Sequence, residues 1–392
     1  MTDPKFITPR MTYATRLILG GGVLALFAIL TINSFLATQG DTTWSDFALY
    51  WSAGRHYLHS EPLYSVARDG FHPYKYPPWA TLLFVPFSLL PLAISGVLWR
   101  LVQVACLAYL FRWSWRLGGF IAAAVTLISF WGFWNLNVLA GQPNLLWIAL
   151  AIYGFETLER RTVVSTTLLA ITLSAKVFHV FSLIGIKPSR WRLKAWVGAA
   201  TFSTLSCIPA LLAYPMPRLR SFLAAYHEAA SGGGSVLGGG GYGLPCLFTD
   251  LLSIPRENTD LRALFFLPSA GLGVLAYWGV RRSVTSPKGA FAAALALGAA
   301  VHPLAYAYTF AFGYPFAAMS LRDSGNSRHW GRRILAWLGI AAIVAMNDKT
   351  LGTVGTFLEA HQIKSLGIFV LALSYLPGFL QDGASGGPSV ER

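Results

Sequence analysis

The chain has 392 residues, of which 55% are hydrophobic and only 12% are charged, with a net charge of +14 and a mean hydropathy of +0.53. This composition excludes an ordinary soluble enzyme and indicates an all-α protein that crosses a membrane many times. The positive charge does not indicate a nucleic-acid partner, because Lys and Arg fall in short clusters between apolar runs, which is the pattern of cytoplasmic loops.

Taking those clusters as cytoplasmic predicts a path for the chain through the membrane. The first apolar run, Leu17 to Leu36, is followed by no small-residue cleavage site, so we expect it to stay as a membrane helix. The predicted segments are about 15–37, 92–111, 117–135, 145–158, 162–186, 195–214, 261–280, 288–302, 304–321, 332–346 and 364–381. They make about twelve transmembrane or broken membrane helices, because the hairpin 162–186 counts as two. This path leaves both termini cytoplasmic.

The segment 162–186 must leave the cytoplasm and return, yet it is too short for two full spans at about 1.5 Å per residue. We interpret it as a broken hairpin with Lys176 near its apex, buried in protein or lining a wet cavity. The alternative is one tilted span in which Lys176 reaches an interface.

Two long loops are predicted outside the membrane, at 38–90 and 215–260, each with short amphipathic helices. Within the second loop, the glycine-rich run 232–241 is either a lid that approaches a ligand closely or a flexible linker. The domain organisation is one transmembrane domain over 1–381 and a Gly/Ser-rich tail, 382–392, that is expected to be disordered.

Asp46 is the first candidate for chemistry. It lies about nine residues beyond the first span, beside Trp44, Tyr50 and Trp51. A partly desolvated carboxylate there can act as a general base toward a hydroxyl, or Asp46 can cap the helix that its neighbours predict. The two roles are compatible.

The other candidates are cations in an otherwise apolar chain. Arg55 suits a phosphate or a carboxylate, or anchors a lipid headgroup. Ionisable groups within membrane segments are functional candidates, although a lone His there is often a packing residue; here they are Arg100, Lys176, His179 and His302.

Nucleotide and metal sites have no signature in the sequence. The three cysteines, Cys106, Cys207 and Cys246, are too widely spaced for a disulfide framework or a zinc site. No P-loop, dinucleotide fingerprint or serine–histidine motif occurs. An enzyme of this kind that works on the outer face needs a substrate delivered by a lipid.

Several motifs together resemble glycosyltransferase family 87, polyprenyl-phosphate-dependent mannosyl- and arabinofuranosyltransferases of the C-type superfamily. The N-terminal block is Asp46-Phe-x-x-Tyr50-Trp-x-Ala-Gly54-Arg55-x-x-Leu58, Leu63-Tyr64 and Tyr76-Pro77-Pro78. Gly141-Gln142-Pro143-Asn144 resembles the Gly-Gln-x-Asn turn of the family, and the resemblance covers roughly residues 15–322.

Three motifs depart from the family pattern. His179 stands where the Lys-x-x-Pro element that begins at Lys176 has its proline, and Tyr308 stands where a late Ser-Pro-x-x-Trp-x-His motif has its histidine. The glycine-rich run 232–241 lacks the Asn-Gln-Ser of relatives. These departures leave the sugar and the acceptor open.

The resemblance implies a C-type glycosyltransferase fold and transfer of a mannose-like sugar from polyprenyl phosphate to a lipid or glycan hydroxyl. The reaction would take place at the outer face of a bacterial cytoplasmic membrane, among membrane lipids, with inversion and with Asp46 as the base. It needs neither a cofactor nor a catalytic metal, since phosphate is a good leaving group. The donor phosphate would be bound by Arg55, Lys176, His179 and His302. The sugar and acceptor would be bound by Tyr50, Tyr64, Tyr76, Trp79, Gln142, Asn144, Tyr306 and Tyr308.

Two other functions fit the same residues. A transporter or flippase for a lipid-linked sugar would use Lys176 and Arg55 as substrate-binding cations, although the chain shows no internal repeat. A non-enzymatic assembly partner is the third reading. Product formation by the purified protein would separate both from a transferase.

Overall fold

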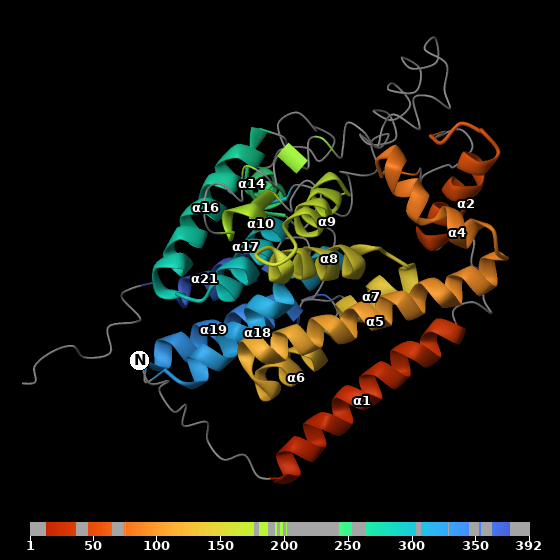
Figure 1. The fold of residues 1–392 in the computed structure, drawn as a ribbon. Coiled ribbons are helices and arrows are strands. Elements are labelled where there is room, and N and C mark those ends of the chain that lie inside the picture. Colours follow the sequence, from red (N-terminus) through yellow and green to blue (C-terminus); the bar gives the residue numbers. More distant parts are fainter. Residues whose placement is uncertain are drawn as a thin grey trace, which may run out of the picture.

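The computed structural model is a bundle of helices (Figure 1). It describes residues 13–36, 46–64, 74, 76–175, 180–186, 193, 197–198, 201, 243–252, 264–302, 307–327, 329–344, 353 and 363–376. These ranges contain no strand, so the predicted all-α class is confirmed for them. The first helices are α1 (Tyr13–Leu36), α2 (Asp46–Leu58), η2 (Pro78–Leu83), α4 (Val85–Ser88), α5 (Leu92–Gly118), α6 (Phe120–Ser129), α7 (Trp131–Ala140) and α8 (Asn144–Thr157). The later ones are α9 (Thr162–Ala175), α10 (Val180–Ile184), α14 (Leu244–Leu251), α16 (Phe266–Ser283), α17 (Pro287–Val301), η5 (Ala307–Gly313), α18 (Tyr314–Gly325), α19 (Trp330–Val344) and α21 (Ile363–Leu373).

Two of these helices, α1 and α5, are long and apolar enough to cross a membrane, within the part of the chain that is described. The pair α6 and α7 makes a third span if its 61° bend is a break within one crossing. Shorter apolar helices lie at Thr162–Leu173, Pro287–Val301 and Ile363–Leu373. The structure therefore supports a membrane protein, and the total of about twelve segments stays a prediction.

The region after the first external loop differs in detail from the expected path. Helix α5 continues to Gly118 instead of ending near residue 111, because it keeps burying side chains such as Trp113 and Leu117. Gly119 then takes a φ of +81°, a conformation that suits glycine, and lets the chain turn directly into α6. The expected span 117–135 is thus two helices that meet at Phe130.

Helix α17 forms the centre of the bundle. Every residue from Gly289 to Val301 is buried, as expected for a helix that is apolar all round. Its many Ala and Gly residues let neighbouring helices approach closely. Its first turn is fixed by Ser286, whose hydroxyl accepts from the Gly289 amide, and by Pro287 at the first position.

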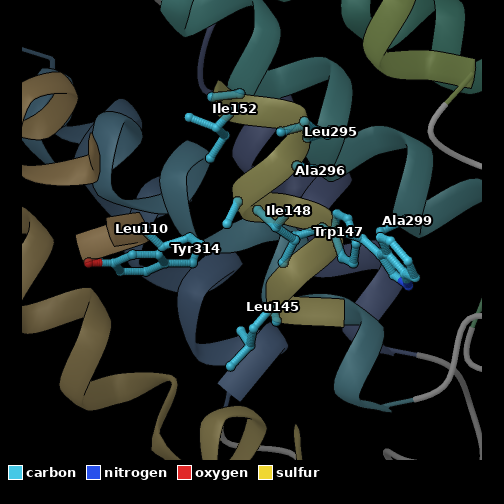
Figure 2. Packing of buried hydrophobic residues seen from close by; sticks show 14 of the residues in the cluster. Leu110, Leu145, Trp147, Ile148, Ile152, Leu295, Ala296, Ala299 and Tyr314 are labelled. Atoms are coloured by element: carbon cyan, nitrogen blue, oxygen red, sulfur yellow. The ribbon is translucent and has the colours of Figure 1, made fainter. Parts of the chain in front are cut away.

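Helix α8 packs beside α17 and connects this centre to the candidate site. The rings of Phe155 and Phe291 stack with centroids 4.2 Å apart. Figure 2 shows side chains of α8 between residues of α17 on one side and residues of α5 and α18 on the other. The labelled residues are Leu145, Trp147, Ile148 and Ile152 of α8, Leu295, Ala296 and Ala299 of α17, Leu110 of α5 and Tyr314 of α18. The N-terminus of α8 is therefore held by a rigid core.

The last turn of α5, at the end of that helix away from α2 (Figure 1), carries Arg116. At that end Arg322 donates to the carbonyl of Leu117. Lys288 at the start of α17 lies 2.8 Å from the carboxylate of Glu156 near the end of α8. Helix α5 runs from α4 at one end to α6 and α18 at the other. Helix α5 thus carries Arg116 at one end, while near its other end Trp99 stacks on Phe47, the residue after Asp46.

Several predicted segments lie outside the described residues. The apex of the 162–186 hairpin falls between α9 and α10, at residues 176–179. The segments 202–242 and 377–392 are also outside, and they include the glycine-rich run 232–241 and the tail. The hairpin, the lid and the disordered tail stay predictions.

Candidate active site

Asp46 is the first residue of α2, and its carboxylate binds a residue from a distant part of the chain. Gln142 Nε2 donates a hydrogen bond to Asp46 Oδ2. One turn along α2, the Tyr50 hydroxyl donates to Gln142 Oε1 at 3.2 Å. The structure thus brings together three of the predicted site residues, which belong to two motifs 92 to 96 positions apart.

The turn that carries Gln142 is held by α5. Gly141 ends α7 in the left-handed conformation, with a φ of +73°. Trp99 Nε1 donates to the Gly141 carbonyl at 2.7 Å, and Arg100 Nη2 donates to the Leu139 carbonyl at 3.1 Å. Two consecutive residues of α5 therefore satisfy carbonyls at the end of α7 that the helix itself leaves unbonded.

A second set of bonds closes the turn from inside. The Gln142 amide N–H donates to the Asn137 carbonyl at 2.9 Å. Asn144, the first residue of α8, donates through Nδ2 to Asn137 Oδ1 at 3.0 Å. Both asparagines are fully buried, so Asn144 supports the turn from within. Its predicted contact with a sugar or an acceptor stays a prediction.

The predicted sugar-binding aromatics form one buried cluster beside this turn. Tyr50 packs edge-to-face on Tyr76 with centroids 5.5 Å apart, and Tyr76 and Trp79 lie 6.4 and 6.2 Å from Trp147 of α8. The hydroxyl of Tyr64 donates to the Tyr76 carbonyl at 2.8 Å. The predicted residues Tyr50, Tyr64, Tyr76 and Trp79 are all below 8% exposed. The rings build the wall behind Asp46, and their contact with sugar stays a prediction.

Tyr76 is neutral at ordinary pH and lies within the field of Asp46. Burial raises the pKa of the Tyr76 hydroxyl well above its usual value, and the nearby Asp46 charge raises that pKa further. The nearby side chains of Trp147 and Tyr50 act in the opposite direction on the pKa of Tyr76 and are outweighed. Asp46 therefore lies near a tyrosine hydroxyl that stays neutral, and a carboxylate in such surroundings can act as a base toward an incoming hydroxyl.

The predicted phosphate-binding residues are less well placed by the structure. Arg55 lies nine residues after Asp46, about 13 Å further along the axis of α2, and stacks over Trp51 at 5.0 Å. His302 follows the last residue of α17. Its carbonyl oxygen lies so close to Gly243 that a β-carbon at position 243 would be 1.8 Å from it. Lys176, His179 and Tyr306 lie outside the described residues, as does the side chain of Tyr308.

Among the described residues, no group of three or more His, Cys, Asp or Glu side chains lies close enough together to hold a metal ion.

Sequence reasoning missed Trp99 and Asn137, which shape the turn, and gave Arg100 a different role. Arg100 was expected to be a functional cation in the membrane, whereas it is 2% exposed and donates to a backbone carbonyl. A helical pattern alone does not reveal which apolar position faces a turn in another segment. The one available signal was the polar pair Asn137 and Asn144, seven residues apart on either side of the turn.

Comparison with known proteins identifies the family. The family model for glycosyltransferase family 87 matches residues 74–306, more than half of the chain. This range contains the Gly141–Asn144 turn and the ring of Tyr76, whereas Asp46 and the rest of α2 lie before it. Searches of curated proteins and of solved structures gave no match. On the family match, this chain belongs to glycosyltransferase family 87.

Proposed function

We propose that this protein transfers a mannose-like sugar from a polyprenyl-phosphate donor to a hydroxyl of a lipid or glycan. The contact between Asp46 and Gln142 supports the proposal most directly. It connects a carboxylate that lies outside the matched residues to the Gly-Gln-x-Asn turn inside them. The family provides the reaction class, and this contact offers a base.

In the proposed reaction, Asp46 accepts the proton of the acceptor hydroxyl, and the oxygen of that hydroxyl attacks the anomeric carbon of the sugar. The bond between that carbon and the donor phosphate oxygen breaks, and polyprenyl phosphate leaves with the electron pair. Attack opposite to the leaving group inverts the anomeric configuration. Cations stabilise the departing phosphate, and the proposed phosphate-binding residues are Lys176, Arg55, His179 and His302.

The proposed setting is the outer face of the cytoplasmic membrane of a bacterium, with the chain in a C-type glycosyltransferase fold of about twelve membrane segments. The charge distribution supports this orientation. Cytoplasmic ends of membrane proteins are rich in Lys and Arg, and Arg116 lies in the last turn of α5, at the end of that helix away from α2 (Figure 1). Asp46 would then face the exterior. A sugar that is linked to a lipid can serve as the donor there, so that no soluble nucleotide sugar is needed.

The test is transfer by the purified protein in proteoliposomes. Radiolabelled polyprenyl-phosphate mannose and polyprenyl-phosphate arabinofuranose serve as alternative donors, with a lipid extract of bacterial membranes as the acceptor. We expect a labelled glycoside from one donor, and a loss of about 10²- to 10⁴-fold in Asp46→Asn and Asp46→Ala. Full activity in Asp46→Asn would exclude Asp46 as the base. Labelled donor that crosses the liposome bilayer without any glycosidic product would favour a flippase instead.

A further inference from the structure

The side chain of Gln142 has only one orientation in which all of its polar atoms meet complementary partners. Its Nε2 faces Asp46 Oδ2, and its Oε1 accepts from the Tyr50 hydroxyl. An ionised carboxylate can only accept hydrogen bonds, so the opposite orientation of the amide would set two acceptor oxygens against each other. Tyr50 reinforces the choice, because its proton is directed to Oε1.

The starting point of this side chain is fixed as well. Gln142 is 4% exposed, and its backbone N–H is bound by the Asn137 carbonyl. The preceding carbonyl, that of Gly141, is bound by the Trp99 indole. The backbone peptide of Gln142 is therefore anchored on both sides, and burial together with the hydrogen bond from Tyr50 restricts its side-chain amide.

Asp46 is more exposed to solvent than several of the residues that follow it in α2. It is the first residue of α2 and is half-buried, whereas Phe47, Ala48 and Tyr50 are buried. A carboxylate at a helix terminus can rotate about its side-chain bonds, and a general base must point at the proton that it removes. The hydrogen bond from Gln142 restricts this rotation.

We infer that Gln142 is a positioning residue, which Tyr50 locks through its hydroxyl and which fixes the Asp46 carboxylate for proton removal. This inference rests on the proposed function, in which Asp46 is the base. It changes the expected role of two residues: Gln142 and Tyr50 act through Asp46, whereas residues that bind a sugar or an acceptor would act on substrate affinity.

Transfer kinetics of Gln142→Ala, Tyr50→Phe and the double variant test the inference. We expect kcat to fall about 10- to 100-fold in Gln142→Ala with KM nearly unchanged, because orientation of the base is lost and substrate contacts are kept. Tyr50→Phe keeps its ring stacked on Phe84, with centroids 4.9 Å apart, and should lower kcat several-fold. The double variant should be no slower than Gln142→Ala alone, since Tyr50 acts through Gln142.

The matched control is Tyr314→Phe. Tyr314 of α18 is fully buried, and its hydroxyl donates to the backbone carbonyl of Ala123 at 3.0 Å. Loss of that hydroxyl should leave kcat within about twofold of the wild-type value if the Tyr50 effect comes from Gln142 and not from weakened packing. A rise in KM without a fall in kcat, or multiplicative effects in the double variant, would overturn the inference.

A second measurement separates failure of the inference from failure of the proposed function. The melting temperatures of Asp46→Ala, Gln142→Ala and their double variant are compared in detergent micelles, where no substrate is needed. We expect the double variant to lose less than the sum of the two single losses, because both remove one hydrogen bond. If the wild type transfers no sugar but this coupling is present, the proposed function is wrong, whereas the hydrogen bond between Asp46 and Gln142 is confirmed. Additive losses would show that the contact is absent.

Discussion

The side chain of Phe47 occupies the space that a β-carbon at position 141 would need. A β-carbon built on Gly141 would lie 2.5 Å from Cβ of Phe47. Phe47 directly follows Asp46, and Gly141 directly precedes Gln142. The close approach of these two residues therefore sets how α2 docks on the turn, and with it the distance between the carboxylate and the amide that binds it.

Substitution of Gly141 by alanine should disrupt this docking. The new β-carbon meets a fixed neighbour, and the φ of +73° is unfavourable for any residue with a side chain by about 1–2 kcal/mol. We expect Gly141→Ala to lower the melting temperature in micelles and to reduce transfer per folded molecule, because Asp46 and Gln142 are moved apart.

Two other glycines separate the clash from the backbone strain. Gly119 also has a positive φ, +81°, but a β-carbon there has nothing within 4 Å, so Gly119→Ala tests strain alone. Gly132 lies in α7 with open space around it, and Gly132→Ala should be neutral or slightly stabilising. If Gly119→Ala costs as much activity as Gly141→Ala, the contact with Phe47 is not what positions Asp46.

The predicted motifs singled out Asp46 and Gln142, but sequence spacing did not reveal how these residues meet. Asp46 and Gln142 were each expected to face a substrate, and the structure shows them bound to each other. The motifs are visible because unusual polar residues stand out in an apolar chain. Which residue of one motif touches which residue of the other depends on the docking of α2, α5 and α7, and that docking depends on packing at residues such as Phe47 and Trp99.

The fold shows the same limit. Apolar runs predicted the positions of α1, α8, α17 and α19 closely, because each run ends at charged or turn-forming residues. The bend at Phe130 was not expected, since residues 120–140 are apolar on both sides of it and contain no proline. Such a break is set by neighbours, here the buried contacts of Phe130 with Trp134 and Tyr314.

The crossing of α19 and α21 depends on a pair of glycines. A β-carbon on Gly367 would lie 2.7 Å from the Gly339 carbonyl oxygen and 2.9 Å from the Ile343 backbone nitrogen. Backbone atoms cannot move aside as a flexible side chain can, so the two helices would have to separate. We expect Gly367→Ala to cost about 1–3 kcal/mol of stability, read as a lower melting temperature in micelles, with transfer by the remaining folded protein unchanged.

The control for this pair is Gly271→Ala in α16. A β-carbon there meets nothing within 4 Å, and alanine favours a helix over glycine by about 1 kcal/mol. The melting temperature should therefore stay the same or rise. Equal destabilisation by Gly271→Ala and Gly367→Ala would mean that the close crossing is not the cause.

The buried Tyr76 predicts a loss of stability in alkali. Because burial raises the pKa of Tyr76 in the folded state, the folded protein keeps a proton that the unfolded chain releases above about pH 10. The contribution of Tyr76 is thus fully present below pH 10 and is lost as the pH rises toward its folded-state pKa, at up to about 1.4 kcal/mol per pH unit. Melting temperatures between pH 8 and pH 11 should fall less steeply above pH 10 in Tyr76→Phe than in the wild type. Equal slopes for the two proteins would show that the Tyr76 hydroxyl reaches water, and the wall behind Asp46 would then be open at that ring.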